Sequence, residues 1–287
     1  MPLHRMATDW QSSPKRVGPG RMLFAVGDIH GHSQQLLALR ELIQGEISRH
    51  SKLRSKIIYL GDYIDRGPDS RGVLQFLADE RQRQTVDSAY LYGNHDSMLK
   101  ILLDMEPDDD PALHQENLEL WLINGGMPAL HSFGIFADGE EGLPADLDSL
   151  RERIRSNLGD AILGFLDELS LFHREDDYLF VHAGVSPYVE FEHCSIDDML
   201  WIRNAFLDAG AYWKHPFCVV HGHTPSCPEI LDHRIGVDTG AYMSGALSAV
   251  QLVDDKVRFL TVAEVPDTSW QNRIYGGRPV FYSLLPA

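Results

Sequence analysis

Short apolar runs separated by amphipathic stretches mark the first third of the chain. The runs at residues 22–26, 57–60 and 89–92 are too short for helices, and each is followed by glycine, which is typical of buried strands. Between them, residues 33–43 carry an apolar stripe at helical spacing that Ser33 can cap, and residues 70–81 also predict a helix. This alternation predicts a βαβαβ unit with parallel strands.

The pattern changes after the third strand. Residues 104–148 hold acidic clusters (Asp108–Asp110 and Glu140–Glu141), several prolines and one amphipathic stretch, so we predict a mainly helical, acidic insert over the site. Residues 147–171 indicate one long helix or a pair of helices. Further strands are predicted at residues 178–181, 217–220, 234–237, 246–253 and 256–262, with a hairpin turn at Asp254–Asp255.

The first 20 residues differ in composition from the rest of the chain. Residues 1–20 are rich in proline and glycine and have little apolar periodicity, so we predict a flexible N-terminal tail. Residues 21–287 are long enough for one α/β domain that buries a full core.

Charge and cysteine content narrow the class of protein. The net charge of −17 argues against a nucleic-acid partner, and an anionic substrate would need arginines or bound metal to hold it. Three cysteines without a CxxC pair favour neither a disulfide framework nor a thiolate zinc site, and a reducing cytoplasm is the expected location. The sequence has no secretory leader pattern and no run of about 18 apolar residues, so we predict no membrane partner.

Five predicted strands are each followed by a loop that carries candidate ligands. The loops read GDIHG (27–31), GDYIDRG (61–67), GNHD (93–96), HAG (182–184) and HGHT (221–224). Open α/β sheets place their sites at such strand ends. Asp28 and His30 can face one ion, and Asp62 can bridge two. This ligand mixture suits manganese, iron or zinc, and two ions roughly 3.5–4 Å apart would activate water and clamp a phosphoryl group.

In order and spacing, these motifs resemble those of the phosphoprotein phosphatase family within the calcineurin-like metallophosphoesterases. The resemblance spans residues 21–262, and the stretches Trp121–Gly126 and Val237–Ala241 are similar to bacterial and phage members. It implies an α/β sandwich of two mixed β-sheets flanked by helices, with a helical insert. It also implies hydrolysis by a hydroxide that bridges two divalent metal ions, with manganese expected and iron or zinc acceptable, and no phosphoenzyme.

The resemblance also implies roles for individual residues. The first metal would be held by Asp28, His30 and Asp62, and the second by Asp62, Asn94, His182 and His223. His95 would protonate the leaving oxygen with support from Asp65, and the phosphate would be bound by Arg66, Asn94, His95 and, as a second arginine, Arg203.

Each position also has a plainer interpretation. Asp and Asn favour turns and caps anyway, so any one ligand could be a turn residue, although the five loops together are not explained that way. We expect His221 to lie behind the site or in the core rather than on a metal. Tyr63 and Trp121 are expected to be packing residues, and Asp108–Asp110 a solvated loop because the spacing of a calcium loop is missing.

The predicted activity is hydrolysis of a phosphomonoester, most simply as a serine/threonine protein phosphatase acting on a phosphorylated protein. The alternative is a diadenosine polyphosphate hydrolase with a small phosphoester substrate. Asp96 stands where eukaryotic phosphatases have glutamate, a change also found in relatives that cleave dinucleotides, whereas Asp65 before Arg66 favours the protein phosphatase. A non-catalytic phosphate-binding scaffold is disfavoured because no ligand position is substituted.

Overall fold

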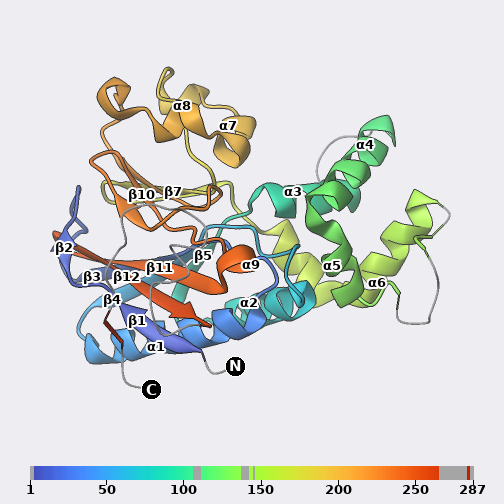
Figure 1. Cartoon of the computed structure of the whole chain (residues 1–287), viewed down its shortest axis with the longest axis horizontal. Coiled ribbons are helices and arrows are strands. Elements are labelled where there is room, and N and C mark those ends of the chain that lie inside the picture. The colour runs from blue at the N-terminus through green and yellow to red at the C-terminus, as the bar shows by residue number, and fades with distance from the viewer. Residues whose placement is uncertain (1–2, 106–110, 137–141, 145, 265–282, 285–287) are drawn as a thin grey trace.

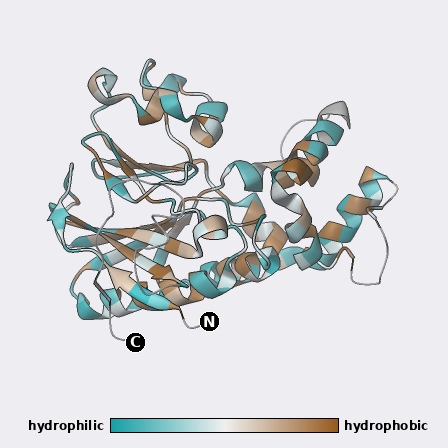
Figure 2. Ribbon diagram, viewed as in Figure 1, coloured by the Kyte–Doolittle hydropathy of each residue, from teal (hydrophilic) through white to brown (hydrophobic). Residues whose placement is uncertain are grey.

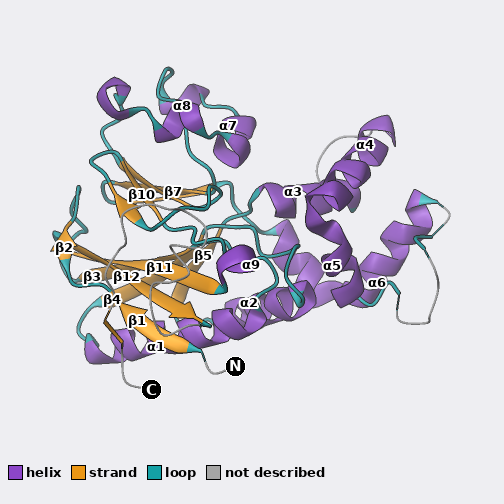
Figure 3. Cartoon of the chain, viewed as in Figure 1, coloured by secondary structure: helices purple, strands orange, loops and turns teal. Residues whose placement is uncertain are grey.

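Two stacked β-sheets form the centre of the molecule, and helices cover their outer faces (Figures 1 and 3). The structure is a computed structural model that describes residues 3–105, 111–136, 142–144, 146–264 and 283–284. The predicted α/β sandwich of two mixed sheets with flanking helices is confirmed.

The larger sheet has eight strands in the order β13-β1-β12-β11-β3-β4-β5, and β2 pairs with β12 beside this path. The strands β3, β4 and β5 are parallel, as the βαβαβ pattern predicts, and the β11–β12 hairpin is antiparallel, with Val253 opposite Lys256. The bounds are β1 (His4–Ala7), β2 (Gln11–Ser12), β3 (Arg21–Val26), β4 (Arg54–Tyr59), β5 (Asp87–Tyr90), β11 (Ala246–Val253), β12 (Lys256–Ala263) and β13 (Ser283–Leu284).

The smaller sheet has five strands in the order β6-β7-β8-β10-β9. Its central strands β7 and β8 run parallel, and the edge strand β6 was not predicted from the sequence. The bounds are β6 (Phe172–Glu175), β7 (Tyr178–Val181), β8 (Cys218–His221), β9 (Glu229–Ile230) and β10 (Arg234–Gly236).

The strand β3 is buried on both faces, which explains its unbroken run of apolar residues. Leu23 and Ala25 point into the apolar layer between the two sheets, while Phe24 and Val26 pack against the helix side. Figure 2 accordingly shows brown, hydrophobic strands inside both sheets and teal stretches on the outer helices.

Two helices connect the parallel strands and cover the larger sheet (Figure 1). These are α1 (Ser33–Arg49) and α2 (Ser70–Arg83). The N-cap of α1 is His32, which makes no capping hydrogen bond with its side chain, and the predicted cap Ser33 lies inside the helix, where its hydroxyl donates to Asp69 at 2.5 Å. Asp69 in turn caps α2 by accepting the amide of Gly72 at 2.9 Å, so the two helix starts are fastened together.

Most of the described part of the insert is helical. It comprises α4 (Pro111–Trp121), a π-helical turn η1 (Leu122–Gly126) and α5 (Met127–Ser132), and it is followed by α6 (Leu147–Asp167), which has non-helical backbone at Gly159. The acidic residues Asp108–Asp110 and Glu140–Glu141 lie outside the described residues. The remaining helices are α3 (Asn94–Leu102), η2 (Phe191–His193), α7 (Ile196–Trp201), α8 (Asn204–Leu207), η3 (Gly210–Tyr212) and α9 (Ala241–Ser244).

The N-terminal segment corrects the prediction of a loosely attached tail. His4–Ala7 forms β1 and pairs with β12 over four residues, and both Met6 and Val17 are buried. A four-residue strand is too short to show periodicity, and its partner lies more than 250 residues away, so nothing local reveals it. Among the described residues, no helix is both long and apolar enough to cross a membrane.

Candidate metal centre

The ligand-bearing loops meet where strands of both sheets end. The loops come from the carboxyl ends of β3, β4, β7 and β8 and from the start of α3. Their polar side chains are almost completely withdrawn from solvent, with at most 5% exposed, for Asp28, His30, Asp62, Asp65, Asn94, His95, His182 and His223. So many buried ionisable groups require compensation by hydrogen bonds, by one another or by a bound cation.

The backbone of the site is locally strained. Five of the nine non-glycine residues with positive φ in the described chain belong to it: His30, Asp62, Asp65, Arg66 and His223. Side chains larger than glycine seldom adopt this conformation, and it persists where surrounding structure enforces it, often at functional sites.

Two glycines are required by close approach. An added Cβ at Gly93 would lie 2.0 Å from Oδ1 of Asp62, and one at Gly222 would lie 2.1 Å from Oδ1 of Asp28. These distances are far inside van der Waals contact, so any side chain at either position would displace a candidate ligand. The glycines of the sequence motifs therefore make room for the carboxylates.

Three ligand atoms of the second predicted metal set converge. Oδ1 of Asn94 lies 3.0 Å from Nε2 of His182 and 2.9 Å from Nδ1 of His223, and the two histidine nitrogens are 3.2 Å apart. Oδ1 of Asp62 lies 3.5 Å from Nε2 of His182. Asp62, His182 and His223 form one of two groups of side chains, among the described residues, whose geometry could hold a metal ion.

This arrangement fits a cation. His182 donates its Nδ1 proton to the carbonyl of Leu60 at 3.0 Å, and burial lowers the pKa of His182, so its Nε2 carries a lone pair. That lone pair faces the carbonyl oxygen of Asn94, which is also an acceptor. Two acceptors at this separation repel each other unless positive charge lies between them, and a backbone bond to the other nitrogen is how metal-binding histidines are oriented.

The other group joins His30, Asp62 and His95. His30 donates from Nδ1 to the carbonyl of Ile64 at 2.8 Å, which leaves Nε2 facing Oδ2 of Asp62 at 3.5 Å. Asp28 is buried beside them, and both of its oxygens lie 3.1 Å from the backbone nitrogen of His223. Its assignment as a metal ligand stays a prediction, because its carboxylate is not in either group.

The charges of the site also call for a cation. Burial, with the charges of Asp238 and Asp62, raises the pKa of Asp28 well above its usual range. Burial opposes ionisation of Asp62 as well, but the histidines around it hold its pKa below the ordinary value. Bound divalent ions would stabilise both carboxylates in the ionised form.

A hydrogen-bonded pair lies beside the two groups. Nδ1 of His95 is 2.6 Å from Oδ2 of Asp65, and both side chains are buried. Although burial opposes protonation of His95, the carboxylates of Asp62 and Asp65 raise its pKa. The guanidinium nitrogens of Arg66 lie 3.0 Å from Nε2 of His95 and 3.1 Å from Nε2 of His30, so this side chain reaches the same space as the candidate ligands.

The remaining predicted residues are placed differently. Arg203 is exposed and donates to Oγ1 of Thr224 at 3.3 Å, next to the HGHT loop. His221 lies outside both metal groups, where it contacts the Arg234 guanidinium at 3.4 Å and the ring of Phe206.

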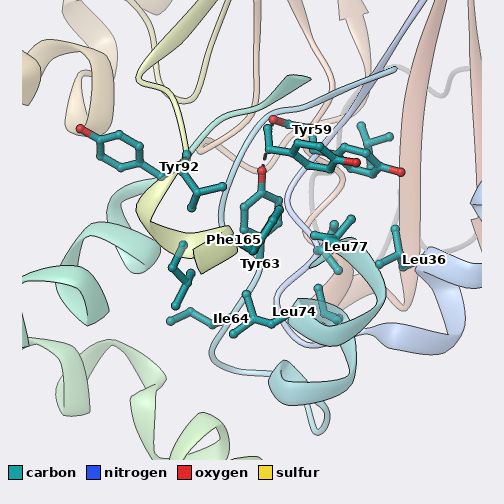
Figure 4. Close-up of a cluster of buried hydrophobic side chains, with 14 of the residues drawn as sticks. Leu36, Tyr59, Tyr63, Ile64, Leu74, Leu77, Tyr92 and Phe165 are labelled. Atoms are coloured by element: carbon teal, nitrogen blue, oxygen red, sulfur yellow. Dashed lines mark hydrogen bonds between the residues drawn. The ribbon is translucent and has the colours of Figure 1, made fainter. Parts of the chain in front are cut away.

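Tyr63 is fully buried, as expected of a packing residue. Its hydroxyl donates to the carbonyl of Leu91 at 2.5 Å. Figure 4 shows its ring beside Leu74, Leu77 and Phe165.

Three buried residues were not assigned to the site from the sequence. Asp96 accepts the amides of Tyr63 at 3.0 Å and Gly93 at 2.9 Å, and so fastens the second ligand loop to the third. Asp238 contacts Asp28, and Trp121 donates to Asp65 at 2.7 Å. Asp96 ends the third motif, and Asp238 and Trp121 lie in the stretches that are similar to bacterial members. The similarity of those stretches did not indicate which side chains these residues contact.

The site lies in loops at the strand ends of a two-sheet α/β sandwich. It has an aspartate shared between two ligand groups and an arginine beside them, which is typical of a metal-dependent phosphoesterase. The chain matches the model of the calcineurin-like phosphoesterase family over residues 23–240, and it belongs to that family.

Two curated relatives carry names from one class of enzyme. A protein of Halalkalibacterium halodurans named asymmetrical bis(5'-nucleosyl)-tetraphosphatase PrpE is 23% identical over 258 residues, which cover 83% of this chain and 92% of that protein. A symmetrical bis(5'-nucleosyl)-tetraphosphatase of Nitrosomonas europaea is 25% identical, but the match covers 60% of this chain and only 48% of that protein. A solved cold-active protein tyrosine phosphatase has the same fold, with a TM-score of 0.51, 16% identity and coverage of 85% and 81% of the two chains.

Proposed function

We propose that this chain hydrolyses dinucleoside polyphosphates, with bis(5'-nucleosyl) tetraphosphates as the substrate class. The observation that carries the proposal is the match with PrpE, which extends over 92% of that protein and 83% of this chain. This choice reverses the order of preference that the sequence motifs suggested. Asp65 before Arg66 favoured a protein phosphatase, whereas the named relatives act on dinucleotides.

The proposed ligand set is the predicted one. Two divalent ions, with manganese as our first choice, would supply the charge that activates a water molecule and neutralises phosphoryl oxygens. Asp62 would be shared between the ions, Asp28 and His30 would complete one side, and the other side would be completed by Asn94, His182 and His223.

The chain's own groups would handle the phosphate and the leaving oxygen. The guanidinium of Arg66 contacts the Nε2 atoms of both His30 and His95, and its charge would there stabilise a bound phosphoryl group. His95, held by Asp65 through Nδ1, would present Nε2 to the departing oxygen and transfer a proton to it. As a bond forms between the water oxygen and phosphorus, the bond between phosphorus and the leaving oxygen would break. The water would release one proton to solvent, and the leaving oxygen would receive one from His95.

A direct comparison of two substrates tests the proposal. Purified enzyme with manganese is given diadenosine tetraphosphate or a phosphothreonine peptide under identical conditions, and kcat/KM is measured for each. We expect a clear preference for the dinucleotide, and chromatography of the products would distinguish two ADP from ATP plus AMP. Preferential hydrolysis of the peptide would instead support the serine/threonine protein phosphatase, and hydrolysis of neither would favour a non-catalytic protein.

A further inference from the structure

Trp121 in the helical insert contacts the core of the site. The indole nitrogen donates to Oδ2 of Asp65 at 2.7 Å, and both side chains are fully buried. We propose that Trp121 is a positioning residue for the Asp65–His95 pair, so that the insert takes part in the chemistry and does not only cover the site. This inference rests on the hydrolytic activity proposed above.

The carboxylate of Asp65 depends on this contact. Oδ2 accepts two hydrogen bonds, from Trp121 and from Nδ1 of His95 at 2.6 Å, while Oδ1 is buried and has no hydrogen-bond partner. Without the indole, the imidazole would be the carboxylate's only side-chain donor. The carboxyl group could then rotate about its bond to Cβ, and His95 would lose the fixed acceptor that directs its Nε2 toward the substrate.

The same turn of the insert also holds the phosphate-binding arginine. The amide of Arg66 donates to the carbonyl of Gly125 at 3.0 Å, and its Nε lies 3.4 Å from the carbonyl of Asn124. The π-helical turn that contains these residues directly follows Trp121. An added Cβ at Gly126 would lie 2.8 Å from the indole ring, so the turn is packed tightly against Trp121.

Two observations separate a positioning role from simple packing. The indole ring lies in the main hydrophobic cluster, so any large apolar side chain would fill that space. The N–H group, however, points to a buried carboxylate and not to a backbone carbonyl. Replacing Trp121 by phenylalanine therefore keeps much of the packing and removes the hydrogen bond.

The decisive measurement is the dependence of rate on the leaving group. Protonation of the leaving oxygen is needed for phenyl phosphate and much less for p-nitrophenyl phosphate, whose leaving group is a weaker base. For Trp121→Phe we expect kcat to fall about tenfold or more on phenyl phosphate and less than about threefold on p-nitrophenyl phosphate, with KM nearly unchanged. Equal losses on both esters would contradict the proposal.

Trp213→Phe is a matched control. Its indole also donates a hydrogen bond, to the carbonyl of Phe217 at 3.1 Å, but it lies in the separate cluster on the outer face of the smaller sheet. We expect this variant to keep the parent's ratio of rates on the two esters. A double variant with Asp65→Asn provides a second test. When Asp65 is already changed, Trp121→Phe should lower kcat on phenyl phosphate little further. Fully additive losses would overturn the proposed route through Asp65.

A spectroscopic measurement tests the contact without any activity. In ¹⁵N-labelled protein, the indole N–H signal of Trp121 is identified by its absence from Trp121→Phe. We expect this signal to shift and to exchange faster with solvent in Asp65→Asn, while the indole signal of Trp213 stays in place. An unchanged Trp121 signal would overturn the inference. If the parent hydrolyses neither diadenosine tetraphosphate nor these esters, the proposed function fails, and this experiment still decides the role of Trp121.

Discussion

The backbone amide of His95 donates a hydrogen bond to Oδ1 of Asp62, at 3.0 Å. The proposed shared metal ligand thus holds the loop that carries the proposed proton donor. Because Oδ2 of the same carboxylate faces Nε2 of His30, at 3.5 Å, Asp62 links both ligand groups and the acid in one small, buried volume.

Asp62→Asn separates the charge of this residue from its hydrogen bond. The amide oxygen can still accept from His95, so we expect a folded protein, but the lost charge should abolish tight binding of two ions. Substitution of a residue that only orients a metal ligand typically lowers activity roughly 10- to 100-fold, and we expect a larger loss here. Metal content by elemental analysis and kcat on the best substrate are the measurements. Asp79→Asn on α2 is the control, and full activity in the Asp62 variant would contradict the proposed centre.

Removal of metal should lower the stability of the protein. Without cations, the carboxylates of Asp28, Asp62 and Asp238 are buried close together and raise one another's free energy. At metal concentrations of 100 times Kd, binding would stabilise the fold by about 2.7 kcal/mol. We therefore expect chelation to lower Tm by several degrees and manganese to restore it. Thermal unfolding with and without chelator measures the effect, and an unchanged Tm would argue against bound ions.

Trp201 is a candidate contact for the substrate beyond its phosphates. It is 38% exposed, and its ring stands edge-on to that of His223, with centroids 6.2 Å apart. Stacking of a base on an aromatic ring contributes about 1–3 kcal/mol, so Trp201→Ala should raise KM for diadenosine tetraphosphate about fivefold or more. KM for p-nitrophenyl phosphate should change little, because that ester has no nucleobase.

Trp10→Ala provides the matched control for this experiment. Trp10 is similarly exposed, at 39%, but it lies near the N-terminal strands, with the guanidinium of Arg258 over its ring. Its loss should leave KM for both substrates unchanged. An equal rise in KM for both substrates in Trp201→Ala would show that Trp201 does not recognise the base.

Glu80 is expected to contribute strongly to stability. This buried carboxylate on α2 accepts hydrogen bonds from the hydroxyl of Tyr59 on β4 and from Arg40 on α1, and so ties three elements together. Glu80→Ala leaves the buried hydroxyl of Tyr59 without this acceptor and removes the ion pair of the half-buried Arg40, which keeps its bond to Gln44, so it should cost about 2–4 kcal/mol in the free energy of unfolding. Urea denaturation measures it. Glu41→Ala, at an exposed ion pair with Arg5, should cost less than about 1 kcal/mol.

Much of the fold was readable from local pattern. The predicted bounds of the strands at residues 178–181 and 246–253 coincide with β7 and β11, because short apolar runs and turn residues are local signals. The strands β1 and β6 were missed. Both strands have only four residues, so their own sequence carries little periodic signal, and their pairing depends on other strands: β1 lies between β12 and β13, and β6 lies at an edge beside β7.

By itself, the sequence determined the fold class, the order of the ligand loops and the residue types at the strand ends, since these depend on neighbours along the chain. Only the tertiary structure decided which atoms meet: the convergence of Asn94, His182 and His223, and the contact between Trp121 and Asp65, which are 56 residues apart. Hydrogen bonds of this kind need positions accurate to a few tenths of an ångström, and only the packing of the complete core sets such positions.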